Sequence, residues 1–136
     1  MKDSRTREFL RKHLPYGNPT RARVGALKAF VKLGWLEAED AGLLKDLLLQ
    51  DKEYAVRAHV LETVSELLDR RLLASVRQAA EKDNDPRARR RAMEVALRLS
   101  EASPVETALS EVKDDLERVK AEHREFRERF SSTRLA

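Results

Sequence analysis

Apolar residues recur along most of this chain at intervals of three and four positions, the spacing that lines one face of an α-helix. The first segment predicts a helix over residues 4–14, with Phe9, Leu10, His13 and Leu14 on its apolar face. A stretch rich in proline and glycine then ends this helix. Helix-forming Ala, Leu, Glu and Arg dominate the chain and aromatic residues make up only 5%, so we expect an all-α protein.

Five further helices follow from the same spacing. They are predicted over residues 19–33, 38–50, 53–68, 71–82 and 85–100. Gly34 suits a left-handed cap after the first of these helices. Asp85 can cap the last one, whose first helical position Pro86 can take.

The last segment follows a different pattern, in which the gaps between apolar positions alternate strictly between four and three. Its seam consists of Val105, Leu109, Val112, Leu116, Val119, His123, Phe126 and Phe130. This heptad pattern predicts one long helix from Pro104 to about Phe130, with residues 131–136 frayed. The helix could cap the rest of the chain or form a homodimer through residues 105–130, and the pattern does not separate the two.

A short motif comes back twice along the chain. Ala22-Arg23-Val24-Gly25-Ala26-Leu27 is matched by Val56-Arg57-Ala58-His59-Val60-Leu61 and by Ala88-Arg89-Arg90-Arg91-Ala92-Met93, at intervals of 34 and 32 residues. Helical repeats of this length are typical of solenoids. We therefore predict about seven helices: a leading helix in 1–18, repeats over 19–103, and a long helix with its tail in 104–136. The long helix would be the second helix of the third pair.

The repeated arginines Arg23, Arg57 and Arg89 fall in the first turns of equivalent helices, and Asp51 and Asp83 lie six residues before the second and third of them. Stacked repeats would bring such arginines close to acceptors in the neighbouring turn. We therefore predict a structural ladder of charge-assisted hydrogen bonds, in preference to contacts with a ligand.

The pattern Asp-x-x-x-x-Val/Ala-Arg-x-x-Ala/Val-Leu/Met resembles the HEAT repeat, a helix pair that stacks into a superhelix, and three copies span residues 17–103. The order of parts is similar to the C-terminal region of zinc aminopeptidases of the aminopeptidase-N type. A leading half-repeat ends in Leu14-Pro15-Tyr16-Gly17-Asn18-Pro19, helix pairs follow, and a heptad-rich helix closes the chain. In that family a helical C-terminal domain restricts access to the active site. The family's H-E-x-x-H and G-x-M-E-N motifs are absent here, so the resemblance implies a non-catalytic part of such an enzyme.

Composition adds some limits. The chain contains no cysteine, which excludes disulfides and thiolate zinc sites and suits a reducing, cytoplasmic setting. No apolar run approaches the length of a membrane span, and the first residues do not open a signal peptide. A charged fraction of 38% points toward a thermophilic source. Residues 1–32 hold nine Lys/Arg against two acids, and residues 33–69 hold three against nine, which suits docking between surfaces.

Candidate chemistry is sparse. The three histidines, His13, His59 and His123, are never paired at helical spacing, so we predict structural roles and no metal site. No nucleophile elbow or phosphate-binding glycine loop is present, and the sequence implies no cofactor. Acidic residues such as Asp40 and Asp114 are expected on solvated helix faces or at caps. We therefore do not expect catalysis by this chain.

Arg87, Arg90 and Arg91 form the sharpest binding feature, because they crowd the start of a helix where free N–H groups also favour anions. They are candidates for contact with an anion or an acidic partner. The sequence thus predicts a scaffold or interaction domain that binds protein, as the C-terminal part of an aminopeptidase or as a stand-alone adaptor. A nucleic-acid-binding solenoid is the weaker alternative, because no stacking platform for bases is evident.

Overall fold

The computed structural model describes residues 2–101 and 104–135, and over these it is all-helical, 85% helical, without a strand. Its elements are α1 (Lys2–His13), α2 (Thr20–Leu33), α3 (Ala38–Gln50), α4 (Tyr54–Leu67), a short 3-10 helix η1 (Arg70–Leu72), α5 (Leu73–Lys82), α6 (Pro86–Glu101) and α7 (Pro104–Leu135). The prediction of an all-α chain is therefore confirmed.

Most predicted boundaries lie within two residues of the observed ones. The last helix differs, because α7 runs to Leu135 where we expected fraying from residue 131. No glycine or proline interrupts the chain between residues 105 and 135, so nothing local stops the helix earlier. Another difference is η1, which the apolar spacing assigned to the following helix. The carboxylate of Asp69 accepts a hydrogen bond from the backbone N–H of Arg71 at 3.1 Å and starts this short turn.

The predicted helix caps are present. Gly34 ends α2 with a left-handed φ of 87°, and its N–H donates to the carbonyls of Phe30 and Val31 at 3.1 Å each. A residue with a Cβ is strained in this conformation, which explains the glycine. At the start of α6, the carboxylate of Asp85 accepts from the N–H of Arg87 at 2.8 Å, and Pro86 takes the first helical position.

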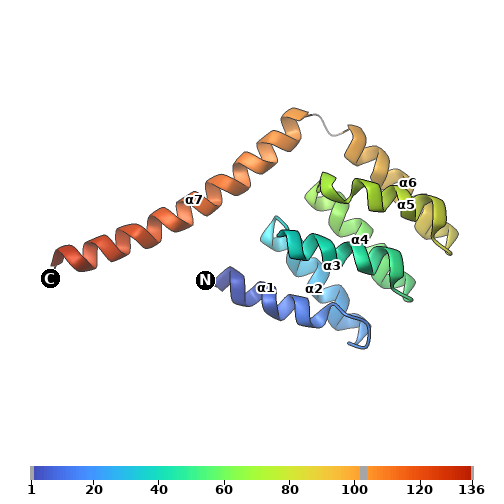
Figure 1. Ribbon diagram of the computed structural model, residues 1–136, viewed down its shortest axis with the longest axis horizontal. Helices are drawn as coiled ribbons and strands as arrows, with labels where there is room; N and C mark the ends of the chain where they lie inside the picture. The colour runs from blue at the N-terminus through green and yellow to red at the C-terminus, as the bar shows by residue number, and fades with distance from the viewer. Residues whose placement is uncertain (1, 102–103, 136) are drawn as a thin grey trace. The chain divides into compact units, whose positions relative to one another are not determined.

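The chain divides into two compact units, Met1–Ala102 and Ser103–Ala136. In the first unit, α2, α4 and α6 pack side by side in one row, and α3 packs beside α5 (Figure 1). Ion pairs join α1 to α3. The helices thus form two layers. The second unit consists of the single helix α7. The predicted pairing of the helix at 85–100 with this last helix stays a prediction.

The core of the first unit lies between the two layers and is built almost wholly from leucine, valine and alanine. Its fully buried large apolar side chains include Leu14, Leu27, Phe30, Leu44, Leu48, Val56, Val60, Leu61, Val64, Val76, Val95 and Leu99. One predicted core residue is wrong: Phe9 is 60% exposed and stacks on His13, with ring centroids 4.2 Å apart. The residues that α1 buries are instead Arg7 and Leu10, and Leu14 is buried directly after the helix ends. Among the described residues, none of the helices has the length and apolar character that crossing a membrane requires.

Candidate functional site: the arginine ladder and its open edge

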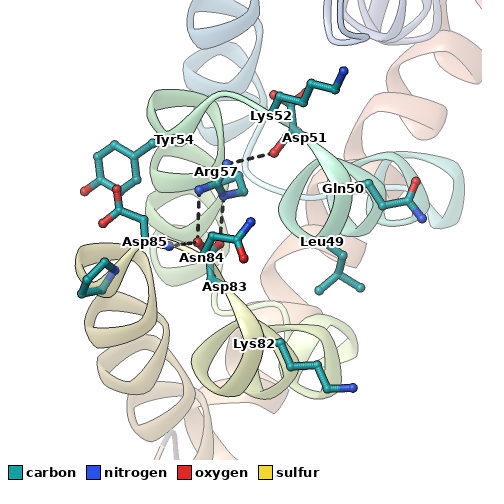
Figure 2. A pocket seen from close by; sticks show the side chains of 11 residues that line it. Leu49, Gln50, Asp51, Lys52, Tyr54, Arg57, Lys82, Asp83, Asn84 and Asp85 are labelled. Carbon is teal, nitrogen blue, oxygen red and sulfur yellow. Dashed lines mark hydrogen bonds and ion pairs between the residues drawn. The ribbon is translucent and has the colours of Figure 1, made fainter.

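The central rung of the arginine ladder joins α4 to the turn before α6. Arg57 donates from Nε and Nη2 to the two carboxylate oxygens of Asp83, at 2.8 and 3.1 Å. Its third nitrogen, Nη1, donates to the backbone carbonyl of Asp51 at 2.9 Å (Figure 2). Both charged side chains are nearly buried, with 11% and 4% of their surface exposed. The guanidinium of Arg57 therefore contacts both the turn before α4 and the turn before α6.

Arg23 makes the same pair of contacts one repeat earlier. Its Nε donates to the carbonyl of Leu14 at 2.8 Å, while Nη1 donates to the carboxylate of Asp51 at 3.2 Å and Nη2 donates to the other oxygen. The arginine side chain is completely buried. Asp51 also accepts from the N–H of Glu53 at 2.9 Å, which shapes the turn that presents it. The structure thus brings the predicted arginines and aspartates together.

The third arginine repeats only half of this arrangement. Arg89 donates from Nη1 to the carbonyl of Asp83 at 2.6 Å, as Arg57 does to Asp51. Among the side chains that the structure describes, no carboxylate accepts a hydrogen bond from the remaining N–H groups of Arg89. The series of arginine–aspartate pairs therefore ends at α6, where Arg89 contacts a backbone carbonyl.

The apolar residues of this helix face are also left uncovered. Leu27 and Leu61, each four positions after a ladder arginine, are completely buried in the core. Met93 holds the same place in α6 and is 61% exposed, and Leu97, one turn further, is 58% exposed. We call Arg89, Met93 and Leu97 the α6 edge. Arg89 is half-buried, whereas Met93 and Leu97 are exposed. Met93 therefore differs from Leu27 and Leu61, which hold the same place in α2 and α4 and are completely buried.

A pocket of about 600 Å³ lies between the turn that follows α3 and the turn that follows α5 (Figure 2). Asp51, Asp83 and Asp85 line it together with Lys52 and Lys82. Each of the three carboxylates already accepts hydrogen bonds from an arginine of the chain. These hydrogen bonds tie the three carboxylates to the turns that line the pocket, so they have a structural role in the unit.

The candidate anion-binding arginines are mostly occupied by partners within the unit. Arg87 lies 2.8 Å from the carboxylate of Asp85 and 4.0 Å from the ring centroid of Tyr54. Arg91 donates to Glu62 at 2.6 and 3.0 Å and also pairs with a glutamate of its own helix. The hydrogen bonds that Arg87 donates to Asp85 and Arg91 donates to Glu62 raise the pKa of the two guanidinium groups. Of these three arginines, only Arg90 is exposed without a partner in the described part of the chain.

A cluster of charged residues lies between α1 and α3, and the sequence patterns did not predict it. Arg7 donates to the carboxylate of Asp40 at 2.6 Å and to the carbonyl of Trp35 at 3.1 Å, and its guanidinium lies 3.9 Å from the Trp35 ring centroid. Arg11 donates to Asp40 and to Glu37, both at 2.7 Å. Asp40 caps α3, as expected of an acid at a helix start, but it is completely buried and not solvated.

The histidines stay apart and serve local roles. Nδ1 of His13 donates to the carbonyl of Phe9 at 2.7 Å, and Nδ1 of His59 donates to that of Ala55 at 2.8 Å. His123 is exposed on α7. No cluster of histidine and acidic residues that could hold a metal ion occurs within the described residues.

Comparison with known proteins adds no relative. No family, no curated protein and no solved structure matches the chain.

Proposed function

We propose that this chain is a non-catalytic, HEAT-like helical-repeat scaffold that binds another protein surface through the α6 edge. Three findings support the repeat assignment. The arginines spaced by 34 and 32 residues lie in α2, α4 and α6, these helices pack in one row, and equivalent contacts link successive turns. Repeats of this kind bury their faces against neighbours, so a terminal repeat keeps one such face uncovered.

The α6 edge carries the proposal. An exposed patch that combines large apolar side chains with unused donors is typical of a binding surface. The chemistry of the partner follows from the ladder: where Arg57 meets Asp83, Arg89 would meet a carboxylate in a turn that begins a helix. Met93 and Leu97 would pack on the apolar face of that helix. The expected partner is therefore a helical surface with an aspartate in such a turn, either in a neighbouring domain of a longer chain or in a separate protein.

Site-specific photo-crosslinking tests this function. A Met93→p-benzoylphenylalanine variant, expressed in the source cells, should give a defined adduct on illumination. The same photoreactive residue in place of Lys45, which is exposed on α3, serves as control and should not give that adduct. Adding Arg89→Lys should reduce the yield about tenfold, because lysine keeps the charge but loses the bidentate geometry.

Arg90→Lys makes the same chemical change at the neighbouring exposed position and should leave the yield unchanged. An adduct that forms equally from position 45, or that does not depend on Arg89, would contradict the proposal. Mass spectrometry of the adduct identifies the contacted residues, which should border an acidic turn at a helix start.

Placement of the scaffold in a zinc aminopeptidase rests on the resemblance in repeat order alone. The native polypeptide, detected in a cell extract with an antibody to this domain, would then be several times heavier than 15.7 kDa. It would also contain H-E-x-x-H. A native polypeptide of 15.7 kDa would favour the stand-alone adaptor. The cytoplasmic location and thermophilic source stay expectations drawn from composition.

A further inference from the structure

An exposed apolar stripe runs along α7, a helix of 32 residues. Its described members are Leu109, Val112, Leu116, Val119 and Phe126, which are 63%, 61%, 50%, 57% and 63% exposed. They follow one another at three and four positions, except where His123 takes one place in the series. A continuous apolar seam on an otherwise charged helix is typical of helices that associate with one another.

The charges beside this stripe are sorted by sign. One flank consists of the positions directly before Leu116 and His123, which are occupied by Asp115 and Glu122. The other flank consists of the positions directly after Val112, Val119 and Phe126. These positions are occupied by Lys113, Lys120 and Arg127. All five side chains are exposed. In paired helices these flanking positions set partner and orientation, because they face each other across the seam.

We propose that α7 joins copies of this chain in a parallel coiled coil. In a parallel pair, the acidic flank of one helix faces the basic flank of the next. Asp115 then meets Lys120 of the second copy, and Glu122 meets its Arg127. In an antiparallel pair, acid would face acid and base would face base, which is unfavourable. Charge complementarity therefore favours a second copy of α7 as the binding partner, and it favours the parallel direction.

Two details refine the assembly. Arg129 holds the next position of the acidic flank, and it donates to Glu125 of its own helix at 2.9 Å. Leu109 and Leu116 occupy the first heptad position, and Val112 and Val119 occupy the fourth. A leucine followed by a β-branched residue in this order also favours coiled coils of more than two helices. The two-copy assembly is thus the smallest that covers the stripe, and the measured mass sets the number of copies.

The mass of the full 136-residue chain in solution is the first test, measured by sedimentation equilibrium over a wide concentration range. The proposal expects about 31 kDa, twice 15.7 kDa, or a higher multiple. A double variant, Leu116→Asp with Val119→Asp, should give 15.7 kDa at the same concentrations. A chain that stays at 15.7 kDa without any substitution overturns the proposal.

Charge reversal tests the direction. Asp115→Lys and Lys120→Glu should each weaken association about tenfold in the parallel arrangement, because each places like charges across the seam. Combined in one chain, the two changes restore opposite charges and should restore affinity. Glu117→Lys makes the same kind of charge change away from the seam and should have little effect.

An antiparallel arrangement predicts the opposite sign for the single variants, because each would then create an attractive pair. Tighter association of Asp115→Lys, or failure of the double variant to recover, would therefore overturn the parallel direction. Failure of this proposal leaves the α6 edge untouched, since the photo-crosslinking experiment does not use α7.

Discussion

The repeated position requires arginine because of the geometry of the guanidinium group. Arg57 uses one side of its planar fork for both oxygens of Asp83 and its remaining nitrogen for the carbonyl of Asp51. Lysine has a single charged atom and cannot make both contacts in fixed directions. The carbonyl contact satisfies a backbone acceptor near a helix start, and the carboxylate contact ties in the next turn. One side chain thus holds both the turn before α4 and the turn before α6.

Substitution Arg57→Ala should lower the free energy of unfolding by about 3 kcal/mol, because it leaves the nearly buried Asp83 without its cation. Urea denaturation followed by the fluorescence of Trp35, the chain's single tryptophan, measures this loss. Arg90→Ala removes an exposed arginine of the same unit and should change stability by less than about 0.5 kcal/mol. Equal losses in the two variants would mean that the ladder does not stabilise the unit.

The Asp85 carboxylate offers a pH test at the same scale. The side-chain hydrogen bond from Arg87, followed by the backbone hydrogen bond from the same residue, lowers its pKa to about 2. A folded-state pKa below the unfolded one means that this group stabilises the fold above the unfolded pKa, near 3.9, and loses that contribution as pH falls through about 2. Arg87→Gln should therefore raise the pKa of Asp85 in an NMR titration of its side-chain carbon. Arg90→Gln should leave it unchanged, and a shift of equal size there would contradict the specific pairing.

At the scale of the helix, two ends adopt the same left-handed conformation with different residues. Gly34 ends α2 at a φ of 87°, and Leu68 ends α4 at a φ of 51°. The glycine could be recognised in the sequence, because glycine adopts this conformation without strain. Leu68 gave no such signal. Its side chain packs against the core of the first unit, and this burial offsets the local strain.

Gly34→Ala should destabilise the first unit by about 1 kcal/mol, because alanine is strained at positive φ although space for its Cβ is available. Gly42→Ala is the comparison, since Gly42 is helical, exposed and equally open. Helix propensity predicts that this change stabilises the unit by about 0.5–1 kcal/mol. The same urea denaturation measures both changes, and a loss of stability in both would contradict the conformational explanation.

At the scale of the whole molecule, the last arginine of the ladder differs from the first two. Arg23 and Arg57 each have a following turn with an aspartate, while Arg89 has a preceding carbonyl only. The same helix face changes from fully buried at Leu61 to largely exposed at Met93. If the chain is the repeat array proposed above, such an unsatisfied face is expected wherever the stacking of helices stops without a capping element. The position of the α6 edge is thus a consequence of where the row of helices ends.

Much of the first unit was predictable from sequence, because its causes are local. Apolar spacing predicts a helix from neighbouring residues, and Gly34, Asp85 and Pro86 mark helix ends through their own backbone and side-chain preferences. The ladder partners were predictable for another reason. Because the arginine and the aspartate recur at similar intervals, a contact between distant positions could be inferred from stacking alone.

Only the tertiary structure decided which charges are buried and which surfaces stay open. Arg7 and Asp40 are 33 residues apart, and their pairing is not repeated elsewhere in the motif. The sequence therefore gave no signal from which their contact could be predicted. Arg87 and Arg91 look like a cationic cluster in the sequence, yet carboxylates of the turn and of α4 balance them once the helices pack. Pairing energies of this kind depend on distances across the fold, whereas helix formation depends on neighbours along the chain. The sequence by itself thus determined the helices and their repeat, and packing alone determined the buried ion cluster and the exposed α6 edge.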